Sequence, residues 1–179
     1  MCDSAANPPH NRNLWAPWRM EYIDSLSQSN NGCFLCHHRD HPDQDDKNLV
    51  LWRGGHTFAL LNRFPYTGGH SLVAPYAHVA ELADLDDAAM LEMVRMLRDL
   101  QKALSAAVHA QGFNIGMNIG HCAGAGLPGH LHAHIVPRWS GDTNFMPVLG
   151  GTTVIPIRLE TLRGQVLQAG AELNLPQLS

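Results

Sequence analysis

Long hydrophobic runs are missing from this sequence, and so are clusters of basic residues. No apolar stretch approaches the roughly 20 residues that a membrane-spanning helix needs. The first residues, MCDSAANPPHNRN, lack a charged start followed by an apolar segment, so we predict no signal peptide and expect a cytoplasmic protein. The 12 lysines and arginines are outnumbered by 16 acidic residues, which gives a formal charge of −4. A nucleic-acid-binding surface is normally basic, so neither nucleic acid nor a membrane is an expected partner.

Cysteine is also scarce, whereas histidine is abundant. The chain has four cysteines, which we expect to be reduced thiols or metal ligands in the cytoplasm rather than disulfides. Cys33 and Cys36 form a C-x-x-C, and Cys2 and Cys122 look unrelated to it. Twelve of the 179 residues are histidines. Because imidazole titrates near neutral pH and binds metal ions, this number points to metal or proton chemistry.

The length and composition are those of one globular domain. Apolar residues make up 45% of the chain and charged residues 16%, which suits a single sizeable core. Residues 1–13 are polar and rich in Pro and Asn, and we interpret them as a flexible tail. Residues 14–179 then form one domain, with a polar loop at 37–48.

The order of apolar patterns predicts an α+β fold: one antiparallel β-sheet with one long and one shorter helix. Gly54–Gly55 is a plausible hairpin turn between the first two strands. Apolar steps of three and four predict a helix from Asp84 to about His109, with Asp84 as its N-cap. Its apolar stripe consists of Met90, Val94, Leu97, Leu100, Leu104 and Val108. The predicted strands are 49–53, 57–62, 70–76, 113–120, 130–137 and 152–157, and the shorter helix is 158–173.

Three histidines alternate with apolar residues in HLHAHIVPRW, residues 130–139. Successive side chains of a strand point to opposite faces, so the histidines are expected together on one face, with the apolar residues in the core. A catalytic group of imidazoles, a pure metal site and a histidine-rich polar face are the possible interpretations, because H-x-H is also a ligand spacing. The histidines are His130, His132 and His134, and they alternate with Leu131, Ala133 and Ile135.

A glycine-rich loop, AGAGLPG at 123–129, directly precedes the three histidines. Glycines let backbone N–H groups turn toward an anion, although they also serve as plain turn material. Beside three imidazoles, the loop favours phosphate chemistry. A neutral imidazole can attack phosphorus to form a phosphoramidate, while neighbouring imidazoles and amides hydrogen-bond the phosphate oxygens.

HLHAHIV matches every position of the histidine triad motif, His-φ-His-φ-His-φ-φ, where φ is apolar. The similarity covers roughly residues 14–157 and includes LWAPWRMEYI, the C-x-x-C, LLNRFPYTGGHSLVAPYAHV, MNIG, AGAGLPGH and PRWSGDTNFMPV. The chain therefore resembles the histidine triad (HIT) family, in its bacterial branch of diadenosine tetraphosphate phosphorylases and ATP adenylyltransferase-like proteins. The resemblance implies a HIT-like fold, a nucleotidyltransferase or hydrolase acting on dinucleoside polyphosphates, preferably with adenine, and a homodimer.

The resemblance also implies the catalytic residues. His132, the middle histidine, would attack the α-phosphate of an adenine nucleotide and form a nucleotidyl-histidine, while His134 would hydrogen-bond that phosphate and assist the leaving group. Attack on the intermediate by phosphate makes a phosphorylase and attack by water a hydrolase; Trp139 and the LWAPWRM segment favour the phosphorylase. Arg138 would either hold the substrate or form a surface ion pair. The alternatives are a HIT-type hydrolase of other nucleotide conjugates and a zinc-stabilised nucleotide-binding module with little turnover; the intact His132 disfavours the module.

Nucleotide-binding residues follow from the same resemblance. LLNRFPYTGGH resembles the nucleotide-binding hairpin of the family, and MNIG carries a polar residue that would face the phosphates. Many members have Gln in the glycine-rich loop where this chain has glycine, so backbone amides would replace a side-chain donor. The implied contacts are Asn62 to the ribose, Phe64 and Pro65 near the base, Asn118 to the phosphates, and the N–H groups of Gly126 and Leu127 in place of the missing Gln.

The C-x-x-C has the spacing of half a zinc site. Its alternatives are a redox pair, which normally opens a helix in a thioredoxin-like pattern, and a buried apolar pair. His37 and His38 are candidate ligands by proximity, although adjacent residues rarely reach one ion well. Zinc-bearing members of the superfamily complete the site with a histidine after a P-x-x-H turn and with the first triad histidine. The resemblance thus implies one closed, structural zinc and no organic cofactor, with Cys33, Cys36, His78 and His130 as ligands.

Overall fold

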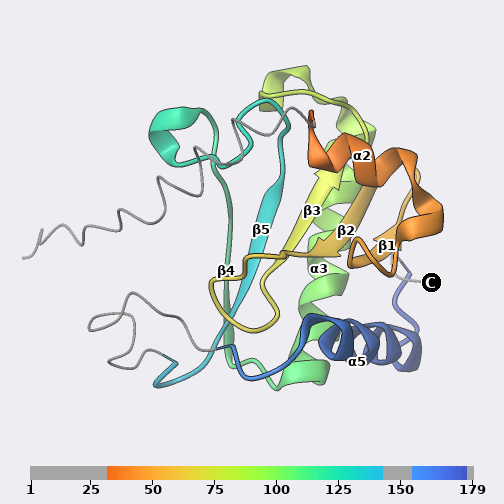
Figure 1. Ribbon diagram of the computed structural model, residues 1–179, viewed down its shortest axis with the longest axis vertical. Helices are drawn as coiled ribbons and strands as arrows, with labels where there is room; N and C mark the ends of the chain where they lie inside the picture. The colour runs from red at the N-terminus through yellow and green to blue at the C-terminus, as the bar shows by residue number, and fades with distance from the viewer. Residues whose placement is uncertain (1–31, 143–154, 177–179) are drawn as a thin grey trace, which may run out of the picture. The chain divides into compact units, whose positions relative to one another are not determined.

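The computed structural model describes residues 32–142 and 155–176, which belong to one compact unit (Figure 1). The expected tail, the aromatic segment LWAPWRMEYI and residues 152–154 of the last expected strand lie outside these residues. Among the described residues, no helix combines the length and the apolar composition needed to cross a membrane.

Five antiparallel strands form one sheet in the order β1-β2-β3-β5-β4. The hairpin at Gly54–Gly55 is confirmed, because the N–H of Gly54 donates to the carbonyl of Thr57 at 2.7 Å and the flanking strands pair. The predicted α+β class is therefore correct. The strands are β1 (Val50–Arg53), β2 (Thr57–Leu61), β3 (Ser71–Pro75), β4 (Gly112–Met117) and β5 (Ala133–Arg138), and the 3-10 turns are η1 (Pro42–Gln44), η2 (Leu82–Asp84) and η3 (His121–Ala123).

The sheet separates two hydrophobic clusters. One face packs against the long helix α3 (Asp87–Val108) and the shorter helix α5 (Leu159–Glu172), which together build the larger cluster. A third helix, α2 (Phe34–Asp40), covers the other face, where Leu35 packs in a cluster with Phe58 of β2. Figure 1 shows α2 and α3 on opposite sides of the sheet.

The segment 37–48, predicted as a polar loop, is partly helical. It contains the second half of α2 and the turn η1. The sulfur of Cys33 accepts the N–H of Cys36 at 3.4 Å and caps α2. Leu35 is fully buried, and its packing stabilises a helix of seven residues that is too short to persist alone. One apolar residue and one cap therefore outweigh the polar composition of the segment.

The long helix is confirmed, but its start and its buried face differ from the prediction. Asp86 rather than Asp84 is the N-cap, because its carboxylate accepts a backbone N–H three residues later at 2.8 Å. Met90 and Val94, predicted to be in the core, are 36% and 58% exposed. Two methionines that continue the leucine face at helical spacing take the core positions instead. The buried residues of α3 are Ala89, Met93, Met96, Leu97, Asp99, Leu100, Ala103 and Leu104.

β5, the strand predicted at 130–137, begins later than predicted. β5 pairs only from Ala133, because the N–H of Leu131 donates to the carbonyl of Val79 at 2.7 Å, outside the sheet. β3 ends at Pro75, which has no N–H to extend the ladder. Residues 155–157 are not a strand, whereas the predicted terminal helix is confirmed as α5.

Gly170 of α5 lies against Trp52 of β1. A Cβ atom at position 170 would stand 2.7 Å from Cζ2 of Trp52. We expect Gly170→Ala to lower the free energy of unfolding by about 1–3 kcal/mol, because the indole must shift. The control is Gly164→Ala on the same helix, where a Cβ meets nothing within 4 Å and alanine should add about 0.5–1 kcal/mol. Urea unfolding measures both changes, and equal stabilities would contradict the close contact.

Candidate active site and metal centre

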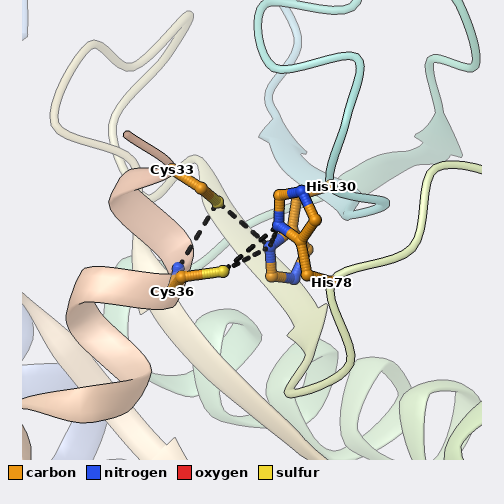
Figure 2. Close-up of side chains that lie close together, drawn as sticks. All are labelled: Cys33, Cys36, His78 and His130. Carbon is orange, nitrogen blue, oxygen red and sulfur yellow. Dashed lines mark hydrogen bonds between the residues drawn. The ribbon is translucent and has the colours of Figure 1, made fainter. Parts of the chain in front are cut away.

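Four side chains from three segments converge in one cluster (Figure 2). Cys33 and Cys36 lie at the start of α2, His78 follows β3, and His130 lies on the chain that leads into β5. Their ligand atoms all lie within 4.8 Å of one another. These are the four residues that the resemblance implies as zinc ligands, although Cys33 and His130 are 97 positions apart.

The distances in this cluster are close to, and partly shorter than, those around a tetrahedral zinc ion. Nδ1 of His130 lies 3.1 Å from Sγ of Cys33, 3.5 Å from Sγ of Cys36 and 3.3 Å from Nδ1 of His78. Sγ of Cys36 lies 3.2 Å from Nδ1 of His78. A tetrahedral ion with Zn–N about 2.0 Å and Zn–S about 2.3 Å separates neighbouring ligand atoms by about 3.3–3.8 Å. Two thiolates and two imidazoles form a closed structural set, with no position left for water.

His130 directs a lone pair into the cluster. Its Nε2 lies 2.9 Å from the carbonyl of Pro75, and because a carbonyl only accepts, Nε2 carries the proton. Burial lowers the pKa of His130 to about 4, so the ring is neutral near pH 7 and Nδ1 is unprotonated. A carbonyl partner of this kind commonly determines which histidine nitrogen binds a metal.

The position of the C-x-x-C is compatible with more than one of its possible roles. The motif does open a helix, as a redox pair would, so its position alone does not exclude redox chemistry. Both cysteines are partly exposed, which argues against a buried apolar pair. The neighbouring histidines face elsewhere: His37 stacks on His41 with ring centroids 4.2 Å apart, and His38 packs edge-on against Phe34. The two histidines opposite the sulfurs therefore favour a metal.

His132 presents an imidazole nitrogen with a defined tautomer beside this cluster. Its Nδ1–H donates to the carbonyl of His130 at 2.8 Å. Burial lowers the pKa of His132, so the ring is neutral and Nε2 keeps its lone pair. An imidazole held in this way can act as a nucleophile.

The three histidines were predicted to share an open face of the sheet, and this prediction is wrong. His130 is fully buried and His132 is only 5% exposed, whereas His134 is half-buried. The apolar residues between them are buried, as predicted. The rings of His132 and His134 lie 5.0 Å apart, so His132 lies among imidazoles rather than in the apolar core. The prediction failed because residues 130–132 precede β5 and are not part of the strand.

A fourth histidine, His70, completes a chain of hydrogen bonds. The N–H of Tyr66 donates to Nδ1 of His70 at 3.1 Å, so Nε2 of His70 carries the proton. That Nε2–H donates to Nδ1 of His134 at 3.0 Å. A neutral His134 then holds its own proton on Nε2. This series of hydrogen bonds therefore places the proton of a neutral His134 on Nε2 of a ring that lies 5.0 Å from the ring of His132.

The hairpin at 62–70 folds back beside these histidines. Nδ2 of Asn62 lies 3.3 Å from Nδ1 of His70, and Oδ1 of Asn62 accepts the N–H of Phe64 at 3.0 Å. The ring centroids of Tyr66 and His70 lie 4.5 Å apart. Phe64 is exposed and Pro65 is partly exposed. The structure thus brings the predicted nucleotide-binding hairpin to the histidines.

The glycine-rich loop before the histidines turns through left-handed backbone conformations. Gly120 and Gly124 have φ angles of 78° and 80°, which flank the turn η3. The N–H groups of Gly126 and Leu127 have no hydrogen-bond partner among the described residues, and a Cβ at 126 would meet open space. Asn118, just after β4, is partly exposed. The backbone N–H groups of Gly126 and Leu127 are therefore available to an anion.

Comparisons with known proteins agree with this geometry. The family model of the HIT domain matches residues 44–141, which is more than half of the chain. The chain belongs to the HIT family. It is 37% identical over 155 residues to the AP-4-A phosphorylase of Mycobacterium tuberculosis, covering 84% of this chain and 80% of the relative. A zinc-bound HIT family protein from Mycobacterium smegmatis superimposes with a TM-score of 0.64 at 25% identity, covering 80% of this chain and 96% of the other.

A further HIT-type relative is an asymmetrical bis(5'-nucleosyl)-tetraphosphatase of Schizosaccharomyces pombe, 33% identical over 93 residues, which cover 52% of this chain and 50% of the relative. These matches confirm the predicted HIT fold and the predicted class, a nucleotide-processing enzyme. The cluster of two cysteines and two histidines can hold a metal ion. The roles of the individual residues stay predictions.

His70 is the residue of this HIT site that the sequence reasoning missed. It is a single histidine at the end of LLNRFPYTGGH and belongs to no repeating pattern. Only the pairing of β3 with β5 brings it to His134, 64 positions away. Its place at the start of a predicted strand, directly after a turn, is the signal that could have drawn attention to it.

Arg138 and Trp139 have structural partners in this HIT fold. The guanidinium of Arg138 pairs with Asp142 and donates to the side chain of Asn114 at 2.9 Å, so the surface ion pair is the observed alternative. Nε1 of Trp139 donates to the carbonyl of His109 at 3.0 Å, where α3 ends in a left-handed residue. Both side chains thus hold the ends of α3, β4 and β5 together.

The free energy of unfolding is expected to decrease as the pH is lowered below about 6.5, because His70 is uncharged in the folded protein. His70 is 1% exposed, and burial, with smaller contributions from His134 and His132, lowers its pKa to about 3. An unfolded histidine titrates near 6.5, so between pH 6.5 and 3 the unfolded state binds the extra proton and is favoured. Urea unfolding at pH 7.5 and pH 5 should differ by about 2 kcal/mol from this group. His70→Gln should reduce that difference, and an unchanged difference would contradict the assignment.

Proposed function

We propose that this HIT enzyme cleaves dinucleoside polyphosphates, with diadenosine tetraphosphate as the preferred substrate, by nucleotidyl transfer through His132 to inorganic phosphate. The observation that carries the proposal is the 2.8 Å hydrogen bond from Nδ1 of His132 to the carbonyl of His130, which leaves Nε2 as a lone-pair nucleophile. The similarity to an AP-4-A phosphorylase supports the substrate class and the choice of phosphate over water.

In the proposed first step, Nε2 of His132 attacks the α-phosphorus of the substrate. The bond from that phosphorus to the bridging oxygen breaks, and a nucleotidyl-histidine forms with release of the remaining nucleotide. Phosphate then attacks the same phosphorus, restores the imidazole and yields ADP. Splitting the transfer in this way lets a single nitrogen serve first as nucleophile and then as leaving group.

His134 is proposed to stabilise the departing oxygen. Its Nε2–H is a donor because His70 donates to its Nδ1 at 3.0 Å. The N–H groups of Gly126 and Leu127 would add donors where many HIT proteins have a glutamine, and Asn118 would face the phosphates. Donors that are positioned in advance act on charge as it develops, which is commonly the largest catalytic effect.

The hairpin is proposed to bind the nucleoside. Asn62 would contact the ribose, while Phe64 and Pro65 would lie near the adenine. The exposed ring of Phe64 can stack on a base, and the Asn62 side chain is already positioned by the N–H of Phe64 and by His70. This arrangement accounts for binding without a basic surface.

Cys33, Cys36, His78 and His130 are proposed as the ligands of one structural zinc ion. When bound, the ion would join α2, the segment after β3 and the chain leading into β5, and so hold the peptide that orients His132. No organic cofactor is part of the proposal.

We further propose a cytoplasmic homodimer in which residues 14–179 form one HIT domain after a flexible tail at 1–13. β4 is an edge strand of the described sheet and carries the exposed Ile115, which makes it a suitable surface for pairing with a second copy. Neither nucleic acid nor a membrane is a proposed partner.

The test is a product assay. The purified protein is incubated with diadenosine tetraphosphate, with and without inorganic phosphate, and the nucleotides are separated. ADP with ATP, formed only when phosphate is present, is the expected result. AMP with ATP would identify a hydrolase instead, and binding without any product would identify a nucleotide-binding module.

A further inference from the structure

The two metal-site cysteines are arranged so that they can also react with each other. Sγ of Cys33 and Sγ of Cys36 lie within 4.8 Å of one another, one helical turn apart (Figure 2). Both side chains are partly exposed, and the contact of Cys36 with His78 lies on the exposed side of the cluster. Rotation of each side chain would bring the two sulfurs together to form the bond.

We propose that Cys33 and Cys36 are an oxidation site: a peroxide converts them to a disulfide, the metal leaves, and His132 loses its alignment. The proposal rests on the zinc ligation proposed above, and its effect on turnover rests on the proposed function. Its tests of metal and of thiols depend on neither substrate nor product.

The chemistry balances with a peroxide as the two-electron oxidant. The sulfur of Cys36 attacks one peroxide oxygen, the O–O bond breaks, and a sulfenic acid forms as water leaves. The sulfur of Cys33 then attacks the sulfur of that sulfenic acid, the S–O bond breaks, and a second water leaves. Two thiolates and two protons are consumed for each peroxide. A disulfide sulfur is a poor zinc ligand, so two imidazoles remain and the ion is released.

The consequence reaches His132 through the backbone. The carbonyl of His130 accepts the Nδ1–H of His132 at 2.8 Å, so the position of His130 determines the tautomer and orientation of His132. The metal joins His130 to His78 and α2, and the next residue is held by the carbonyl of Val79 at 2.7 Å. Release of the metal frees Nδ1 of His130, so that its ring is held by the hydrogen bond from Nε2 to Pro75 and its backbone by the N–H donated to the carbonyl of Leu127 at 3.3 Å.

The test uses a variant that removes the other thiols, Cys2→Ser with Cys122→Ser, loaded with zinc. Hydrogen peroxide is added in increments, and free zinc is followed with a chromogenic chelator. Mass spectrometry of peptides locates any disulfide, and nitrogen-15 NMR of labelled histidine follows the Nδ1–H of His132. We expect one zinc released per disulfide, loss of the His132 signal and at least about tenfold lower turnover. Dithiothreitol with added zinc should reverse all of these changes.

A chelator at pH 7.5 under reducing conditions provides the matched control. It should reproduce the NMR change and the loss of turnover without forming a disulfide, which separates metal loss from oxidation. A protein that contains no zinc, that keeps its zinc and both thiols under peroxide, or that keeps the His132 signal after the disulfide forms would overturn the proposal. If the untreated protein turns over no nucleotide, the proposed function fails, while zinc release, the disulfide and the imidazole signal still decide this inference.

Discussion

His132→Ala is expected to lower turnover of diadenosine tetraphosphate by about 10⁴-fold or more while the protein stays folded. The variant removes the only imidazole in the described site whose Nδ1–H donates to a backbone carbonyl and whose Nε2 then carries a lone pair beside His134. His134 does not substitute for it, because its Nδ1 accepts from His70 and its Nε2 holds the proton. Steady-state rates with and without phosphate measure the loss.

The control for this prediction is His56→Ala. His56 is exposed in the turn between β1 and β2, and it has no role in the proposed site. Its turnover should match that of the parent protein, and both variants should keep the parent's circular dichroism spectrum. The hydrogen bond lost with His132 should lower the free energy of unfolding by only about 1–3 kcal/mol. Turnover within tenfold of the parent in a folded His132→Ala would rule out the proposed nucleophile.

Loss of the metal site is expected to have the largest effect on stability. A structural zinc contributes apparent binding energies of about 10–16 kcal/mol, which become folding energy when the unfolded chain does not bind the ion. Here the ion would connect three segments that are distant in the sequence, namely the start of α2, the loop after β3 and the chain before β5. Cys33→Ser, or treatment of the parent with a strong chelator, should lower Tm by about 10 °C or more.

Calorimetry and elemental analysis check this prediction together. The parent should contain about one zinc per chain, and Cys33→Ser much less. The matched control is Cys122→Ser, since Cys122 is exposed and outside the cluster. That variant should keep both the metal and the Tm of the parent. A parent protein with no more than trace zinc and an unchanged Tm after chelation would remove the metal from the account of this fold.

Local patterns in the sequence were sufficient for most of the elements and for the family. The hairpin at Gly54–Gly55, the long helix and the terminal helix are confirmed because each depends on neighbours within a few residues. The motif HLHAHIV predicted the histidine segment in the same way, since its spacing is a property of seven consecutive residues. The four-residue ligand set came from the resemblance and not from spacing.

The sequence by itself thus determined the class of fold, the family and the histidine segment, because hydrophobic periodicity and motif spacing are local. Tertiary structure decided which atoms meet. Periodicity alone placed Met90 and Val94 in the core, and packing exposed them because Met93 and Met96 fit the sheet better. The link from His70 to His134 spans 64 positions and exists only because β3 pairs with β5. Strand pairing across such distances leaves no periodic trace in the sequence, and the proton positions on which the proposed chemistry depends follow from it.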